Sequence, residues 1–151
     1  MAMGFCKQGD KLQMIIFVDI DETICTDVEE TIKMESYGGY IRETKDYSKA
    51  KPIQERIDYV NKLYYAGHTI VYWTARGTKT LIDWTQITRN QLDDWGVKYT
   101  ELRLGKPHYD LFIDDKNIEA ERYFEETFET EKANSEFEEH YKKTLEKLND
   151  N

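Results

Sequence analysis

The chain has 151 residues, of which 39% are hydrophobic and 34% charged, and its formal net charge is −9. This length suits one domain with one core, and the negative charge argues against nucleic acids and anionic membranes as partners. Two cysteines cannot form a disulfide framework, and no stretch resembles a membrane span or a signal peptide, so we expect a cytoplasmic protein.

Three short apolar runs, at residues 14–18, 70–73 and 111–113, are the main strand signals along the chain. A continuous run of this length is typical of a strand buried on both faces, as in a parallel sheet. Residues 97–99 predict a shorter edge strand.

Helical patterns alternate with these runs. Apolar residues recur at helical spacing over 53–64, 80–95 and 117–128, and Gly67 and Gly96 are suited to end the first two helices. Strands that alternate with helices predict a doubly wound, Rossmann-like α/β fold with a mostly parallel sheet. We therefore expect a single domain with its core at about 14–128, and ligands bound beyond the carboxyl ends of the strands.

Two further segments fall outside this alternation. Residues 25–51 predict a flap, with a hairpin turn at Gly38 and Gly39. Residues 133–149 predict a C-terminal helix with a narrow apolar stripe, which we expect to dock on the body of the protein. The alternative for this stripe is an oligomer contact.

The first apolar run ends at Asp19, and Asp21 follows two residues later in Asp-Ile-Asp-Glu-Thr. One carboxylate can attack a phosphoryl group, while the other protonates the leaving oxygen and later activates water. Two carboxylates beside a phosphate repel it, and Mg²⁺ would relieve that repulsion. The alternative is an acidic loop that caps a helix.

The second run ends at Thr74, whose hydroxyl can donate to a phosphate oxygen beside the backbone N–H groups of the next turn, Ala75 and Arg76. Lys106 can neutralise the nucleophile and the phosphate together. Each has an ordinary alternative, a strand-ending threonine and a solvated surface lysine. The third run ends at Asp114 and Asp115, adjacent acids that a cation would stabilise, or else solvated turn residues.

These four pieces, in this order, resemble the motifs of the haloacid dehalogenase-like superfamily across about residues 14–125. The wording Trp-Thr-Ala-Arg-Gly and Ile-Asp-Asp-Lys is similar to small phosphatases of capsule and surface-polysaccharide gene clusters. The resemblance implies the following roles: Asp19 as nucleophile and Mg²⁺ ligand; Asp21 as general acid/base, with its backbone carbonyl on the metal; Thr74, Ala75, Arg76 and Lys106 at the phosphate; Asp115 as a direct metal ligand, supported by Asp114.

The spacing of the motifs leaves no room for a cap domain. Only the flap and one helix separate Asp19 from Thr74, and only one helix and a short strand separate Thr74 from Lys106. Tyr37, Tyr40 and Arg42 of the flap could contact the leaving group.

The sequence therefore predicts a Mg²⁺-dependent phosphatase for a phosphate monoester, a sugar phosphate or another small metabolite. One alternative is phosphotransfer to an acceptor other than water, which the missing cap disfavours because the intermediate needs protection from water. A second alternative is a catalytically idle, metal-binding interaction module. A polynucleotide-end phosphatase fits the charge less well. A homo-oligomer stays open.

Overall fold

The computed structural model of the chain describes residues 6–8 and 11–149, so the ends of the predicted 1–151 domain lie outside the described residues. The chain divides into two compact units, the first ending at Phe112 and the second beginning at Ile113. In the described part of the chain, no helix is long and apolar enough to cross a membrane.

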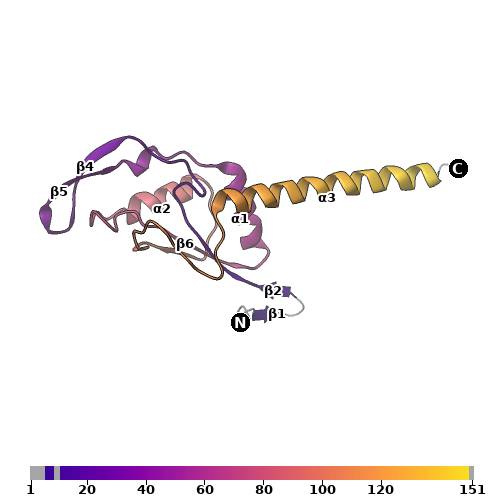
Figure 1. The fold of residues 1–151 in the computed structure, drawn as a ribbon, viewed down its shortest axis with the longest axis horizontal. Helices are drawn as coiled ribbons and strands as arrows, with labels where there is room; N and C mark the ends of the chain where they lie inside the picture. Colours follow the sequence, from indigo (N-terminus) through magenta and orange to yellow (C-terminus); the bar gives the residue numbers. More distant parts are fainter. Residues whose placement is uncertain (1–5, 9–10, 150–151) are drawn as a thin grey trace. The chain divides into compact units, whose positions relative to one another are not determined.

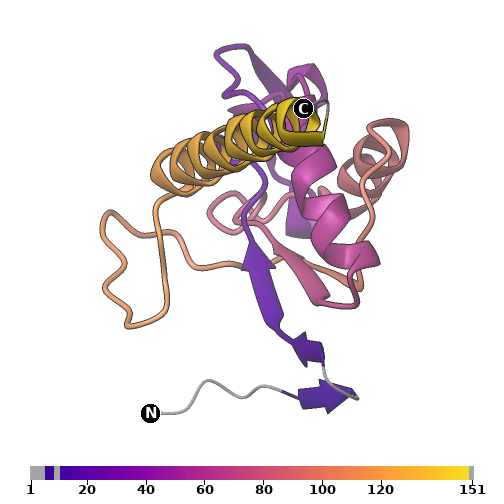
Figure 2. The ribbon, with the colours of Figure 1, turned by 90° about the vertical axis from the view of Figure 1, so that its right-hand side faces the viewer.

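A parallel three-stranded sheet forms the centre of the first unit. Its strands are β3 (Ile15–Val18), β6 (Thr69–Trp73) and β7 (Glu101–Arg103), in the order β3-β6-β7. Ile15 pairs with Thr69 and Val71 with Glu101, so all three strands end at the same edge of the sheet (Figure 2). The mixed α/β fold with a parallel sheet is confirmed.

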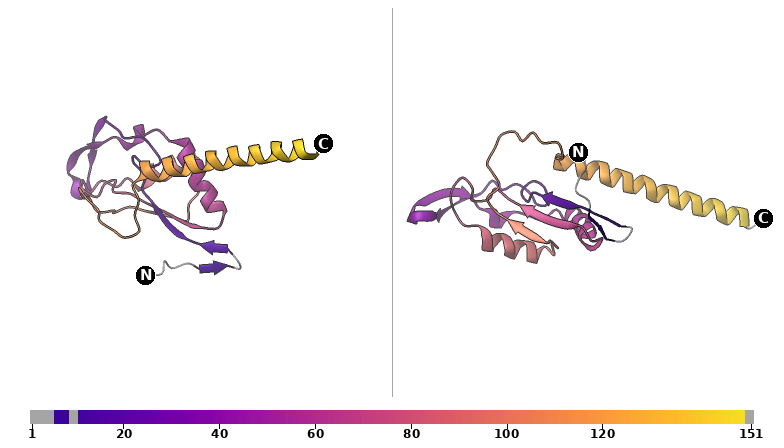
Figure 3. Two further views of the ribbon diagram at one scale, coloured as in Figure 1. Left: turned by 45° about the vertical axis from the view of Figure 1, so that its right-hand side comes forward. Right: turned by 90° about the horizontal axis from the view of Figure 1, so that it is seen from below.

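Two helices connect these strands. Helix α1 (Gln54–Tyr65) packs against β6 with Ile57 and Val60 buried, and α2 (Thr85–Asp94) runs along the strands in the right-hand view of Figure 3. Both connections step across the sheet in the same direction, and right-handed crossovers of this kind put their helices on one face.

The two faces of the sheet differ in burial. Ile16, Val18, Ile70 and Tyr72 share the face of the helices, where Ile70 and Tyr72 are fully buried. On the other face of β3, Ile15 is 66% exposed and Phe17 50% exposed. The predicted burial of the first strand on both faces is therefore wrong for β3, because the described helices of this unit cover one face.

Antiparallel pairs form the flap and the N-terminal segment. The flap consists of β4 (Thr31–Glu35) and β5 (Ile41–Lys45), joined by the turn η1 (Tyr37–Gly39), where Gly38 has a left-handed φ of 83° (Figure 1). The predicted hairpin is confirmed. Strand β1 (Cys6–Gln8) pairs with β2 (Lys11–Gln13), and a second short turn, η2 (Tyr47–Lys49), follows the flap.

Two strand predictions are wrong. The strand expected at residues 97–99 lies at Glu101–Arg103, because the Val97 N–H still closes α2 on the carbonyl of Leu92 and pairing with β6 begins only at Thr100. The apolar run at residues 111–113 is a loop, with Leu111 75% and Ile113 88% exposed. A run of three apolar residues is typical of a strand, but it does not reveal whether a neighbouring strand is available to pair with it.

Helix bounds also differ from the predictions. Helix α2 begins at Thr85, not near residue 80, because Leu81 has a left-handed φ of 59° that no helix allows. The two helices expected at 117–128 and 133–149 form one helix, α3 (Ala120–Asn149), since no glycine or proline interrupts the sequence between them. Its apolar stripe, including Phe137 and Tyr141, is exposed, and its docking stays a prediction.

Candidate functional site

The chain reverses direction directly after β3. The N–H groups of Thr23 and Ile24 both donate to the carbonyl of Ile20, at 3.1 and 2.9 Å, and Glu22 has a left-handed φ of 60°. This turn keeps Asp19 and Asp21 together at the carboxyl end of the strand, the edge at which parallel sheets bind ligands.

Asp19 faces a lysine from the loop after β7. The Lys106 ammonium Nζ lies 3.6 Å from Asp19 Oδ2, and the Asp19 side chain is 38% exposed. The backbone N–H of Lys106 donates to the carbonyl of Thr74 at 3.1 Å, which ties this loop to the end of β6. Burial raises the pKa of the Asp19 carboxyl, while Lys106 opposes that shift by favouring the charged form.

Asp21 faces an arginine instead. Arg76 donates from Nε to Asp21 Oδ2 at 2.9 Å and from Nη2 to Asp21 Oδ1 at 2.8 Å. The Arg76 side chain has no exposed surface, and that of Asp21 is 24% exposed. Two parallel hydrogen bonds of this kind fix the orientation of a carboxylate as well as its charge.

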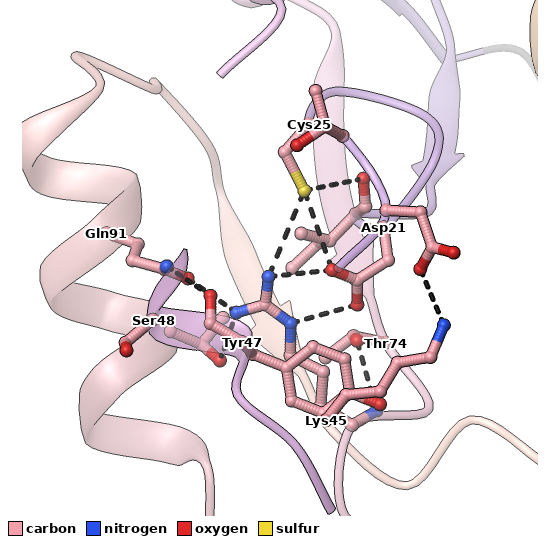
Figure 4. A network of polar contacts seen from close by, with 12 residues as sticks. Asp21, Cys25, Lys45, Tyr47, Ser48, Thr74 and Gln91 are labelled. Carbon is pink, nitrogen blue, oxygen red and sulfur yellow. Dashed lines mark hydrogen bonds and ion pairs between the residues drawn. The ribbon is translucent and has the colours of Figure 1, made fainter. Parts of the chain in front are cut away.

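Arg76 is itself held by side chains from α2 and from the turn η2. Its Nη1 donates to Gln91 Oε1 at 2.6 Å and to Thr88 Oγ1 at 3.2 Å, and its guanidinium lies 4.8 Å from the ring centre of Tyr47. Figure 4 shows Asp21, Tyr47 and Gln91 gathered in this network. Burial opposes the charge of Arg76, but its bonds to Asp21 raise its pKa above the usual value.

The sequence alone does not predict this arrangement, although it contains one signal. Thr88 and Gln91 are polar residues on the otherwise apolar inner face of α2, and both are buried. A buried glutamine on such a face needs a hydrogen-bond partner. Arg76 was predicted at the phosphate; the described structure directs its guanidinium to Asp21, Thr88 and Gln91, and a phosphate contact stays a prediction.

Cys25 lies on the same side of the turn as Asp21 (Figure 4). Its Sγ lies 3.5 Å from Asp21 Oδ1 and its side chain is fully buried. Burial, with the charge of Asp21, raises the pKa of the thiol to about 12. The sulfur is therefore a neutral hydrogen-bond donor at neutral pH and a poor nucleophile.

Thr74 is buried at the end of β6, with 1% of its surface exposed. Its Oγ1 accepts a hydrogen bond from the Arg76 N–H at 3.2 Å, which leaves the hydroxyl proton free to be donated. Ala75 begins the next turn, closed by the Thr78 N–H on the Ala75 carbonyl at 3.0 Å. Gly77 follows with a φ of 79°, and a Cβ there would lie 2.0 Å from the carbonyl oxygen of Ile82.

Asp114 and Asp115 belong to the second unit, where both are exposed and the Asp115 N–H donates to Asp114 Oδ1 at 2.7 Å. Among residues 6–8 and 11–149, no three histidine, cysteine, aspartate or glutamate residues are grouped so that they could hold a metal ion. Asp19 and Asp21, the two predicted ligands in the first unit, do not by themselves form a complete magnesium centre. Asp19 supplies one hard oxygen ligand, while the carboxylate of Asp21 is engaged by Arg76.

The site thus contains two carboxylates with different partners. Asp19 is partly exposed and faces the Lys106 ammonium group, whereas Asp21 is oriented by a buried guanidinium. Carboxylates whose surroundings differ in this way are suited to different chemical roles.

Comparisons with known proteins support the fold. No protein-family model matches the chain, and no curated protein matches it. The crystal structure of a target protein from Vibrio cholerae is similar, with a TM-score of 0.55 and 25% sequence identity, over 72% of this chain and 85% of that one. The chain is therefore similar in fold to that bacterial protein, over most of the length of both.

Proposed function

We propose that the protein hydrolyses a phosphate monoester through a covalent aspartyl-phosphate on Asp19. The observation that carries this proposal is the pairing of Asp19 with Lys106 at 3.6 Å, two residues from an Asp21 that Arg76 holds in place. The order of the motifs, similar to that of the haloacid dehalogenase-like superfamily, supports the same conclusion.

In the first step an Asp19 carboxylate oxygen attacks phosphorus, and the bond from phosphorus to the leaving oxygen breaks. Lys106 balances the charge shared by Asp19 and the phosphate, and the Thr74 hydroxyl donates to a phosphate oxygen. Asp21 in its acid form gives a proton to the leaving oxygen.

In the second step water attacks phosphorus and the bond to Asp19 breaks, which releases phosphate. Asp21, now a carboxylate, takes the proton of the attacking water. The bidentate contact with Arg76 suits this second step best, because it holds Asp21 as an oriented carboxylate. An ester whose leaving group is stable as an anion, such as p-nitrophenyl phosphate, needs no proton from Asp21 in the first step.

Mg²⁺ belongs to this proposal as the cation that would offset the charge between Asp19 and the phosphate. We further propose a doubly wound core without a cap domain. The metal-binding role of Asp114 and Asp115 stays a prediction.

Turnover of p-nitrophenyl phosphate with Mg²⁺ tests the activity. Asp19→Asn should abolish hydrolysis, by a factor on the order of 10⁴ or more, because an amide cannot replace the nucleophile. Asp94→Asn is the matched control, since Asp94 is an exposed residue at the end of α2. Full activity in Asp19→Asn, or no hydrolysis by the unaltered protein, would contradict the proposal.

A further inference from the structure

A pocket of about 440 Å³ lies directly beside the proposed phosphate site. One wall, Arg76–Thr78, continues from Thr74, and another, Leu104–Gly105, leads into Lys106. The Thr78 hydroxyl donates to the carbonyl of Lys106 at 2.8 Å, so the two walls are joined at the phosphate end. A pocket of this size suits part of a small molecule.

The lining of this pocket is mostly apolar. Leu81, Ile82 and Leu104 contribute aliphatic side chains, and Tyr37 contributes an aromatic ring from the flap. Leu81 is 57% exposed and Tyr37 is 84% exposed, so both large side chains lack a protein covering.

Asp83 and Thr85 also line the pocket, but Asp83 accepts a hydrogen bond from the Thr85 N–H. Thr78 donates its hydroxyl to the carbonyl of Lys106. The hydroxyls of a polyol would therefore find few partners there and would lose hydrogen bonds to water on entry.

Leu81 is held in a conformation that leucine rarely adopts. Its φ of 59° is left-handed, its N–H donates to the carbonyl of Gly77 at 2.8 Å, and its carbonyl accepts from the Tyr37 N–H at 2.9 Å. This second bond joins the flap to the pocket wall. A strained residue fixed from both sides is a frequent feature of binding sites, and here it presents an apolar side chain to the pocket.

We propose that this pocket binds the leaving group of the substrate, and that this leaving group carries a flat, apolar ring placed between Tyr37 and Leu81. The inference rests on the proposed function, because a phosphate bound at Asp19 and Lys106 determines where in the pocket the ring of the leaving group lies. It narrows the substrate class to ring-bearing phosphate monoesters, in place of open-chain polyol phosphates.

Binding of two phosphonates, which carry no hydrolysable ester, tests the pocket independently of turnover. With Mg²⁺, the unaltered protein should bind phenylphosphonate at least about ten times more tightly than methylphosphonate by calorimetry, as expected when a ring leaves water. Leu81→Asn should remove most of this preference and leave methylphosphonate affinity unchanged. Asparagine tolerates a left-handed φ, so the turn should be retained.

Two further variants complete the design. Tyr37→Ser changes an exposed side chain and should weaken phenylphosphonate binding in the same direction. Leu145→Asn, on α3, is the matched control and should behave as the unaltered protein. Equal affinity for the two phosphonates, or an unchanged preference in both Leu81→Asn and Tyr37→Ser, would overturn the pocket assignment.

Turnover separates this inference from the proposed function. Phenyl phosphate should be hydrolysed with a higher kcat/KM than glycerol phosphate, and Leu81→Asn should lower the value for phenyl phosphate alone. Equal values for both esters would overturn the ring pocket while leaving the hydrolase intact. A ring preference in binding without hydrolysis of any ester would support the pocket and overturn the hydrolase.

Discussion

The two carboxylates at the carboxyl end of β3 differ in their surroundings. On one side Asp19 is 38% exposed and faces a single lysine ammonium at 3.6 Å. On the other side Asp21 contacts a guanidinium with no exposed surface, itself bound by Gln91 and Thr88. The open side leaves room for a substrate to approach, and the buried side provides fixed orientation. This difference is why we assign attack to Asp19 and proton transfer to Asp21.

Removal of Lys106 should produce the largest effect on the open side. Lys106→Ala should lower kcat/KM for p-nitrophenyl phosphate about 10³-fold, because a preorganised positive charge beside the reacting groups is lost. Lys106 also counteracts the burial that raises the pKa of Asp19. Without it that pKa rises further, so the acidic limb of the pH–rate profile should move to higher pH.

Lys98→Ala is the control for this measurement, since it removes an exposed lysine elsewhere in the first unit. If the Lys106→Ala protein kept full kcat/KM and the acidic limb of its pH–rate profile did not move, the Lys106 ammonium group would have no part in catalysis.

Stability should distinguish the two carboxylates. Asp21→Asn leaves the buried Arg76 without its anionic partner and should lower the free energy of unfolding by about 3 kcal/mol. Asp19→Asn should leave it unchanged or raise it at pH 7. The pKa of Asp19 is raised by burial, so the folded state loses stability as the pH rises from the ordinary value of 3.8 through that raised pKa, and the loss is complete above it.

Urea unfolding of both variants at pH 7 gives this comparison in one experiment. Equal stability of Asp19→Asn and Asp21→Asn would mean that Arg76 does not depend on Asp21 in solution.

Tyr72 provides a buried polar group without an ionic partner, as a reference for Arg76. It is fully buried on β6, and its hydroxyl has no hydrogen-bond partner among the described residues. Tyr72→Phe should therefore be about 1 kcal/mol more stable at pH 7. Burial also raises the pKa of the Tyr72 hydroxyl above its ordinary value of 10.0.

The alkaline behaviour follows from that shift. Above pH 10 the unfolded tyrosine loses its proton while the folded one keeps it, so the stability of the unaltered protein falls as pH rises. The advantage of Tyr72→Phe should widen between pH 9 and pH 11 in urea titrations. A constant or shrinking difference over that range would refute this description of the β6 core.

Residues near strand ends were predictable from the sequence. The apolar runs before Asp19 and Thr74 predict parallel strands, and parallel strands bring their carboxyl ends to one edge. The structure places these residues there, with Lys106 tied to Thr74 by its backbone. The hairpin at Gly38 was also predictable, because its turn needs a residue with a left-handed φ and glycine adopts one readily.

Partners distant in the chain were not predictable in the same way. Asp21 and Arg76 are 55 residues apart, and neither residue type identifies the other. Leu81 looked like part of a helix because its apolar side chain fits the spacing, but its left-handed φ places it on a pocket wall. The run at 111–113 carries strand propensity, yet pairing depends on a neighbour that composition does not specify.

Trapping of the covalent intermediate tests the central claim most directly. In Asp21→Asn, p-nitrophenyl phosphate should still react, because its leaving group needs no proton, while hydrolysis of the phosphoenzyme slows without the base. Rapid acid quenching and mass spectrometry should then find one added phosphoryl group on the peptide that contains Asp19. Turnover of the ester with no phosphoryl group on that peptide, or with the group on another residue, would contradict the assignment of Asp19 as the nucleophile.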